Sequence, residues 1–141
     1  MKLNEIAIEK KKKVFLGGTC NESTWRDELI ELLSIDYFNP VVDDWTEECY
    51  QEELKQRKIC DYVLYVITPK MSGVYSIAEV VQDSNKKSGK TIFCVLSTDN
   101  GTSFDKGQLK SLEAVSKMVA SNGANVFSDL KSVAEFLNSK S

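Results

Sequence analysis

The stretch Asp61-Tyr62-Val63-Leu64-Tyr65-Val66-Ile67-Thr68 is an almost continuous apolar run, rich in β-branched and aromatic residues. Such a run is typical of a central parallel strand that is covered by helices on both of its faces. Residues 71–81 follow it directly, and their pattern predicts a loop that turns straight into a helix. A buried strand with a helix behind it is the repeating unit of α/β folds.

Shorter apolar runs lie on both sides of this strand and alternate with helical segments. We expect further strands at residues 14–16, 37–42, 91–96 and 125–127. We expect helices at about residues 23–33, 46–59, 76–85, 105–120 and 128–137. Asn39-Pro40 interrupts the second strand, which favours a short or edge strand there. Strict alternation predicts an α/β fold with a five-stranded parallel, doubly wound (Rossmann or flavodoxin-like) sheet in the order 2-1-3-4-5.

Local signals give three helix starts. Thr24 and Asp27 have the spacing of a capping box, Thr46 is a good N-cap, and Ser128 is placed to cap the last helix. The predicted elements fill residues 13–137, so we expect one domain over 1–141, with residues 1–12 as a loose N-terminal extension.

Composition narrows the chemistry. The net charge of −3 gives no reason to expect binding to nucleic acid or to an acidic membrane surface. No apolar run approaches the about 20 residues that cross a bilayer, and the N-terminus lacks a signal-peptide core, so we expect a cytoplasmic protein. The chain has 4 Cys without a C-x-x-C pair and no His, so we expect no metal site. Any catalysis has to use carboxylates, Lys, Tyr, Cys or hydroxyl groups.

The predicted strand order also locates a ligand site. In such sheets ligands bind beyond the carboxyl ends of the strands, where the strand order reverses, here between the first and third strands. The loop Gly17-Gly18-Thr19 and the loop from Thr68 to Tyr75 would face each other there. Gly17 and Gly18 allow a ligand to approach the backbone closely, although a plain tight turn explains them as well.

Acidic residues near this point are candidates for the chemistry. Glu79 lies in about the first turn of the helix after the third strand, where the helix dipole and free amides favour an ionised carboxylate. Such a carboxylate is a competent nucleophile or general base, whereas the alternative is an ordinary early-helix acid. Asp43 and Asp44 follow the second strand, either as paired carboxylates of the site or as turn residues before a helix.

Several motifs, in this order and spacing, together resemble the nucleoside 2-deoxyribosyltransferase-like family over roughly residues 13–97. They are Val14-Phe15-Leu16-Gly17-Gly18-Thr19, Tyr37-Phe38-Asn39-Pro40, Cys60-Asp61-Tyr62-Val63-Leu64-Tyr65-Val66, Ser72-Gly73 and Glu79. The resemblance implies that Glu79 attacks the anomeric carbon of a deoxynucleoside, that the base leaves, and that a second base or water releases the sugar. It also implies that Glu53 assists the leaving base as an acid, while a solvent-facing helix acid is the alternative.

Two positions depart from the family pattern. Phe15 stands where members often carry a Tyr whose hydroxyl steadies the nucleophile, and Tyr75 or Ser76 could replace that donor. The loop before Glu79 lacks the acid that the transferases often carry, and Ser72 resembles instead the hydroxyl that related nucleotide N-glycosidases use near the sugar 5′ end.

We therefore expect an enzyme that cleaves or exchanges the N-glycosidic bond of a deoxynucleoside or nucleotide through a covalent glycosyl-glutamate intermediate, with Glu79 and Glu53 as catalytic residues. The predicted substrate-binding residues are Gly17, Gly18, Thr19, Asp43, Asp44, Ser72, Gly73 and Tyr75. The resemblance further implies a homo-oligomer, and the expected reaction needs no cofactor. A non-catalytic nucleotide-binding or partner-binding module and a TIR-like NAD-cleaving domain are the alternatives.

Overall fold

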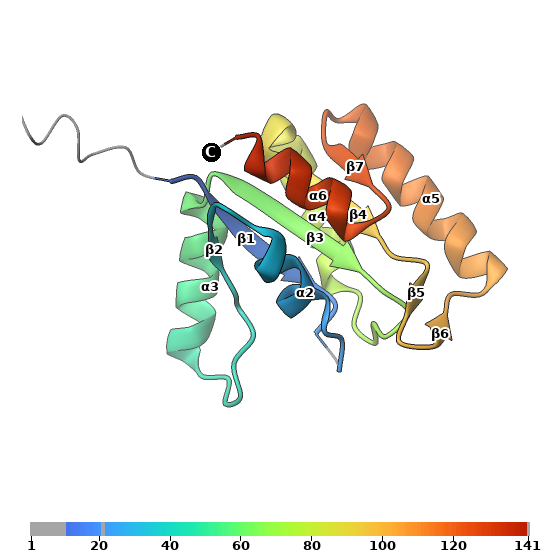
Figure 1. The fold of residues 1–141 in the computed structure, drawn as a ribbon, viewed down its shortest axis with the longest axis horizontal. Coiled ribbons are helices and arrows are strands. Elements are labelled where there is room, and N and C mark those ends of the chain that lie inside the picture. Colours follow the sequence, from blue (N-terminus) through green and yellow to red (C-terminus); the bar gives the residue numbers. More distant parts are fainter. Residues whose placement is uncertain (1–10, 21, 141) are drawn as a thin grey trace, which may run out of the picture.

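The computed structural model describes residues 11–20 and 22–140 of the chain. A parallel sheet of five strands in the order β2-β1-β3-β4-β7 lies at its centre (Figure 1). The strands of this sheet are β1 (Lys13–Gly18), β2 (Asp36–Phe38), β3 (Tyr62–Ile67), β4 (Thr91–Val95) and β7 (Asn125–Phe127). The helices are α2 (Trp25–Leu32), α3 (Glu47–Ile59), α4 (Tyr75–Lys86), α5 (Lys106–Ser121) and α6 (Leu130–Asn138), with a 3-10 turn at Ser88–Lys90. This order confirms the predicted doubly wound α/β fold.

Helices cover both faces of the sheet, and alternate strand residues pack against each cover (Figure 1). On one face, Val14, Leu16 and Leu64 pack in a cluster with residues of α2 and α6. On the other, Phe15 and Tyr65 pack in a second cluster with residues of α4 and α5. Because successive strand residues point to opposite faces, two separate cores confirm that β1 and β3 are central strands.

Strand β2 is short and lies at the edge of the sheet, as predicted, and it pairs with β1 alone. It ends at Phe38, however, and Val41 and Val42 lie beyond it in an exposed loop rather than in the strand. The side chain of Asn39 accepts a hydrogen bond from the backbone N–H of Val41 at 3.0 Å. This local bond, with Pro40 between the two residues, turns the chain away from the sheet.

Thr46 is confirmed as an N-cap, the capping box predicted at Thr24 is not formed although α2 starts there, and the cap of the last helix lies one residue beyond the predicted Ser128. The hydroxyl of Thr46 accepts a hydrogen bond from the backbone N–H of Cys49 at 3.1 Å, as an N-cap does. Thr24 is not extended (φ −100°, ψ 12°), so its hydroxyl does not cap the helix and instead donates to the carboxylate of Glu28 at 2.9 Å. The last helix is capped by Asp129, the residue after Ser128.

A two-stranded antiparallel hairpin of β5 (Thr98–Asp99) and β6 (Thr102–Ser103), which was not among the predicted elements, lies between β4 and α5. Both turn residues have positive φ angles, 46° at Asn100 and 85° at Gly101, which is the conformation that an Asn-Gly pair favours. The hydroxyl of Ser23 donates to the carboxylate of Asp99 at 2.6 Å. This bond fixes the hairpin to the loop that follows β1.

The predicted N-terminal extension, except for Lys11 and Lys12, lies outside the described residues. Among residues 11–20 and 22–140, no helix is both long enough and apolar enough to cross a membrane.

Candidate active site

The strand order reverses between β1 and β3, and the two loops that follow these strands are bonded to each other. The backbone N–H of Thr19 donates to the carbonyl of Val66 at 2.9 Å. The backbone N–H of Thr68 donates to the hydroxyl of Thr19 at 3.0 Å. The predicted meeting of these loops is therefore present, and one backbone bond and one bond to a side-chain hydroxyl hold them together.

Packing of the strands requires both glycines at the end of β1. Gly18 has a φ of +120°, and a Cβ atom there would lie 2.0 Å from the carbonyl oxygen of Val66. A Cβ atom on Gly17 would lie 2.7 Å from the ring of Tyr65. Gly17 thus leaves the space that the Tyr65 ring fills, and Gly18 lets the chain turn beside β3.

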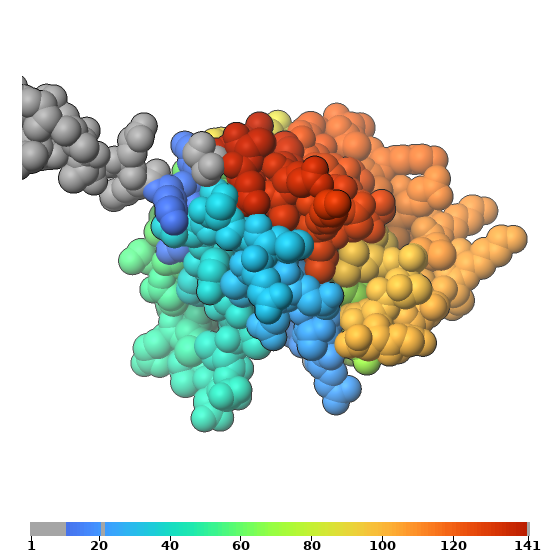
Figure 2. Space-filling view, viewed as in Figure 1, coloured from blue at the N-terminus to red at the C-terminus, as the bar shows by residue number. Residues whose placement is uncertain are grey.

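Two adjoining cavities open above this glycine pair, one of about 300 Å³ and one of about 280 Å³. The larger is lined by Phe15, Gly17, Gly18, Cys20, Arg26, Pro40, Val41, Val42, Trp45, Glu53, Tyr75, Ser76 and Glu79. The smaller is lined by Gly18, Thr19, Cys20, Ile67, Met71, Ser72, Gly73, Tyr75 and Ser76. Figure 2 shows the loops after β1 (blue) and β2 (teal) and the β5–β6 hairpin (gold) projecting on this side of the molecule.

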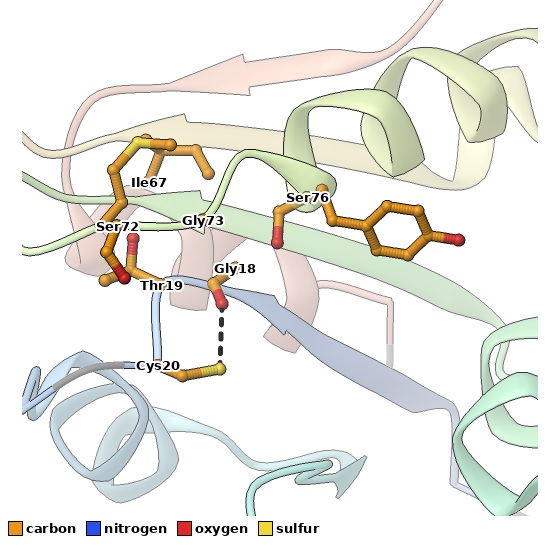
Figure 3. Close-up of a pocket in the computed structure, with 9 residues that line it drawn as sticks. Gly18, Thr19, Cys20, Ile67, Ser72, Gly73 and Ser76 are labelled. Atoms are coloured by element: carbon orange, nitrogen blue, oxygen red, sulfur yellow. Dashed lines mark hydrogen bonds between the residues drawn. The ribbon is translucent and has the colours of Figure 1, made fainter. Parts of the chain in front are cut away.

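The structure divides the predicted site residues between these cavities. Glu79, Glu53 and Gly17 line the larger one only, and Thr19, Ser72 and Gly73 line the smaller one only. Gly18 and Tyr75 line both. Figure 3 shows Thr19, Ser72 and Ser76 arranged around Gly18, so the smaller cavity is rich in hydroxyl groups.

Asp43 and Asp44 are exposed and line neither cavity. Val41, Val42 and Trp45, which lie on either side of them in the sequence, line the larger cavity instead. Together with Phe15 they give this cavity an apolar wall. Trp45 is 61% exposed, so an aromatic ring is available at the mouth of the cavity.

Glu79 lies in the second turn of α4, not in the first, and only 8% of it is exposed. Burial raises its pKa to about 7, and the charges of Glu53 and Asp83 add to the rise, while Arg57 opposes it. Glu79 therefore lies beyond the free amides of the first turn, and burial acts against the ionised form that those amides were expected to favour. A carboxylate with a pKa near 7 is more basic and more nucleophilic than an ordinary one.

Arg57 of α3 lies between Glu79 and Asp83 of α4. Its Nη1 atom is 3.6 Å from Oε2 of Glu79, and its Nε atom donates to Oδ2 of Asp83 at 2.9 Å. Its Nη2 atom donates to Oδ1 of Asp83 at 3.1 Å and to Oε1 of Gln82 at 2.8 Å. The hydroxyl of Tyr65 also donates to Oδ2 of Asp83, at 2.6 Å.

Glu53 shares the larger cavity with Glu79. It is half-buried, and burial raises its pKa, while the charges of Arg26 and Arg57 lower it. Two carboxyl groups whose pKa values are both raised by burial therefore line one cavity. This is the arrangement that acid-assisted cleavage of a glycosidic bond requires.

Arg26 of α2 is a cavity residue that the sequence pattern did not indicate. It is 5% exposed and its guanidinium donates to three backbone carbonyls at the end of β1: Leu16 at 3.0 Å, Thr19 at 2.6 Å and Gly18 at 3.3 Å. Burial lowers its pKa, and the neighbouring Cys20 and Glu53 act in the opposite direction. Its carbonyl bonds fix the shape of the glycine loop.

Among the residues that the structure describes, no group of three or more Cys, Asp or Glu side chains is arranged to hold a metal ion.

Comparison with known proteins agrees with this geometry. The sequence model of a protein family described as nucleoside 2-deoxyribosyltransferase like matches residues 11–98, which run from β1 through the two cavities to β5. A search of curated proteins finds none that matches the chain.

Proposed function

Because the chain belongs to the nucleoside 2-deoxyribosyltransferase-like family, we propose that it breaks the N-glycosidic bond of a deoxynucleoside or nucleotide through a covalent intermediate on Glu79. The observation that carries this proposal is the buried Glu79 carboxylate with a pKa of about 7, in a cavity that also holds Glu53. Burial makes Glu79 a stronger nucleophile, and Glu53 supplies an acid within the same cavity.

In the first step an oxygen of ionised Glu79 attacks C1′ of the sugar, and a C–O ester bond forms. The bond from C1′ to the base nitrogen breaks, its electron pair goes to the base, and protonated Glu53 gives that base a proton. The developing positive charge at C1′ is stabilised by the negative carboxylate. Neutralising the leaving base contributes about 10²- to 10⁴-fold in reactions of this type.

In the second step a nitrogen of another base, or a water oxygen, attacks C1′ from the vacated side. The C1′–Oε bond breaks, its electron pair returns to Glu79, and Glu53 takes the proton that the incoming group loses. Attack by a base gives transfer, and attack by water gives hydrolysis. Both begin with the same intermediate, so one site accounts for either outcome.

The two cavities suit the two parts of a nucleoside. The wall of Phe15, Val41, Val42 and Trp45 offers apolar surface to the flat faces of a base. The hydroxyl groups of Thr19, Ser72 and Ser76 in the smaller cavity offer hydrogen bonds to sugar or phosphate oxygens. With Glu79 in the first cavity and Gly18 shared by both, the anomeric carbon lies at their junction.

A product assay tests this proposal. The protein is incubated separately with each deoxynucleoside or its 5′-monophosphate, with and without a second free base, and with NAD. The expected products are an exchanged nucleoside or a free base with its sugar, together with a deoxyribosyl adduct on the acid-quenched protein by mass spectrometry. Release of nicotinamide from NAD alone, or no product from any substrate, would contradict the proposal.

Replacing Glu53 with glutamine is expected to slow cleavage by about 10²- to 10⁴-fold for natural bases, because the leaving base no longer receives a proton. The loss should shrink for a synthetic nucleoside whose base leaves readily as an anion. The measurement is kcat for both substrates in the variant and in Glu52→Gln, a neighbouring α3 acid that lines neither cavity. An equal loss for both substrates would remove the acid role from Glu53.

We also propose that the protein acts in the cytoplasm as a homo-oligomer, without a nucleic-acid or membrane partner. All 4 cysteines are free thiols, as is usual in a reducing compartment. An apolar groove of about 890 Å³ between α4 and α5 adjoins the smaller cavity through Met71 and Ser72, and it supports an interface at this place. The net charge of −3 supports the absence of a nucleic-acid partner.

A further inference from the structure

Arg57 makes a closer contact with one acid of α4, Asp83, than with the other, Glu79. Its side chain makes two hydrogen bonds to the carboxylate of Asp83, at 2.9 and 3.1 Å, in the forked geometry that guanidinium groups favour. Its distance to the Glu79 carboxylate is 3.6 Å, beyond the usual range of about 2.7–3.2 Å for such hydrogen bonds. Asp83 is therefore the anchor of Arg57, and Glu79 feels the charge of Arg57 at longer range.

Further contacts hold Arg57 in this position. The Tyr65 hydroxyl donates to Asp83 at 2.6 Å, and Asp83 is 4% exposed, so its carboxylate is fixed from both sides. Nη2 of Arg57 also reaches the backbone carbonyl of Glu79 at 3.4 Å. Glu79 and Asp83 are one helical turn apart on α4, so they present both carboxylates to the same guanidinium.

This arrangement resolves two opposing needs of a carboxylate nucleophile. A direct, bidentate bond from arginine would orient Glu79 but would also stabilise its charge and weaken its attack. A carboxylate with no partner would be poorly oriented and would stay protonated in a buried site. A guanidinium that is bonded to Asp83 and lies near Glu79 orients the nucleophile while leaving its oxygens available.

We infer that Arg57 is a positioning residue, held by Asp83 and Tyr65, that aims the Glu79 carboxylate at the cavity without bonding it tightly. The effect of Arg57 on turnover rests on the proposed function. The effect of Arg57 on the Glu79 carboxylate rests on geometry alone. The inference assigns roles to Arg57 and Asp83, which lie outside the sequence motifs, and to Tyr65, which lies in one of them but had no role assigned.

The charged groups around Glu79 determine how a substitution at Arg57 or Asp83 changes the pKa of Glu79. The titratable or charged groups near it, on every element packed around the cavity, are Glu53 and Arg57 of α3, Asp83 and Tyr75 of α4, Tyr65 of β3, Arg26 of α2 and Cys20 of the loop after β1. Hydrogen bonding to Asp83 and the nearby negative charges outweigh burial and raise the pKa of Arg57, so Arg57 stays charged throughout.

The first experiment is titration of Glu79 by carbon NMR in protein labelled at the glutamate carboxyl carbons, without substrate. The Glu79 signal is assigned by its loss in Glu79→Gln. In Asp83→Asn the guanidinium loses its charged anchor and pairs with Glu79, and one negative neighbour disappears. The pKa of Glu79 is expected to fall from about 7 by at least about one unit.

The second experiment separates orientation from charge. Arg57→Lys keeps the positive charge but loses the planar fork, so an ammonium group cannot hold Asp83 at two points and face Glu79 as well. We expect kcat to fall by about tenfold or more, with KM within about twofold of the wild type, since the substrate contacts remain. The matched control is Lys58→Gln, which removes an exposed positive charge one residue away on α3 and should leave both the Glu79 pKa and kcat unchanged.

The outcomes distinguish this inference from the proposed function. An unchanged Glu79 pKa in Asp83→Asn overturns the inference whether or not the protein turns over a nucleoside. Full kcat in Arg57→Lys, or equal effects in Lys58→Gln, overturns the positioning role while leaving the Glu79 mechanism in place. A wild-type protein without turnover, in which the Asp83→Asn shift is present, supports the arrangement around Glu79 and rejects the proposed reaction.

Discussion

Replacing Glu79 with glutamine is expected to abolish turnover, with a loss of at least about 10³-fold in kcat, because an amide oxygen cannot form the covalent ester. The variant should still bind substrate, since the apolar wall and the hydroxyl groups of the smaller cavity are intact. Initial rates and acid-quenched mass spectra give the measurement, and the deoxyribosyl adduct should be missing from the variant. Turnover near the wild-type rate would exclude Glu79 as the nucleophile.

The same substitution is expected to stabilise the protein, but only at high pH. The pKa of Glu79 rises from 4.5 to about 7 on folding, so the folded state favours the protonated acid. The stabilisation that this protonation provides is complete below pH 4.5 and is lost as the pH rises through about 7. A shift of this size corresponds to roughly 3 kcal/mol, which glutamine, being neutral, does not lose.

Urea denaturation at pH 5 and pH 8 checks this expectation. Glu79→Gln should gain roughly 1–3 kcal/mol over the wild type at pH 8 and much less at pH 5. The matched control is Glu113→Gln on α5, where an exposed acid pairs with Lys117 at 3.2 Å. An exposed pair of this kind contributes less than about 1 kcal/mol, so the control should show no gain at pH 8. A loss of activity that accompanies a gain of stability would mark Glu79 as a residue kept for function.

Replacing Gly18 with alanine is expected to destabilise the fold by about 3 kcal/mol or more. A Cβ atom there would lie 2.0 Å from the carbonyl oxygen of Val66 and 2.6 Å from its nitrogen, and the φ angle of +120° is one that alanine rarely adopts. Backbone strain and a clash with the backbone of β3 add together, and neither can relax by rotating a side chain. The measurement is the free energy of unfolding in urea.

Two other glycines serve as controls that separate these causes. Gly101 has a φ of +85° but open space around it, so Gly101→Ala should cost only the backbone strain, about 1 kcal/mol. Gly89 has open space and no positive φ, so Gly89→Ala should be neutral or slightly stabilising. If Gly18→Ala lowered the free energy of unfolding no more than Gly101→Ala does, the close approach of Gly18 to β3 would not contribute to the cost of the substitution.

The sheet could be predicted from the sequence because its information is local and periodic. The buried run at β3 and the alternation of strands with helices lead to the strand order without any knowledge of contacts. The missing capping bond at Thr24 and the cap at Asp129 in place of Ser128 depend on backbone angles that composition does not reveal. The missed hairpin had a local signal, the pair Asn100-Gly101, between strands too short to show alternation.

The candidate site was predictable only in part, for a physical reason. Glu79 and the glycine pair follow directly from the ends of β3 and β1, so their meeting depends on strand order alone. Arg57 and Asp83 lie 26 residues apart, and their contact depends on how α3 packs beside α4. The raised pKa of Glu79 likewise depends on burial by several elements of the fold. The predicted position of Glu79 near the start of the helix had indicated a lowered pKa instead.

The space that Gly17 leaves for the ring of Tyr65 has a consequence for how this protein and its relatives can change over evolution. Since the Tyr65 ring lies where a Cβ atom of residue 17 would be, and its hydroxyl bonds to Asp83, the two positions cannot vary independently. A relative with a side chain at position 17 should carry a smaller residue at position 65. It would then need another donor for the acid at position 83. Covariation of these three positions across relatives would therefore record the same packing that the present structure shows in one molecule.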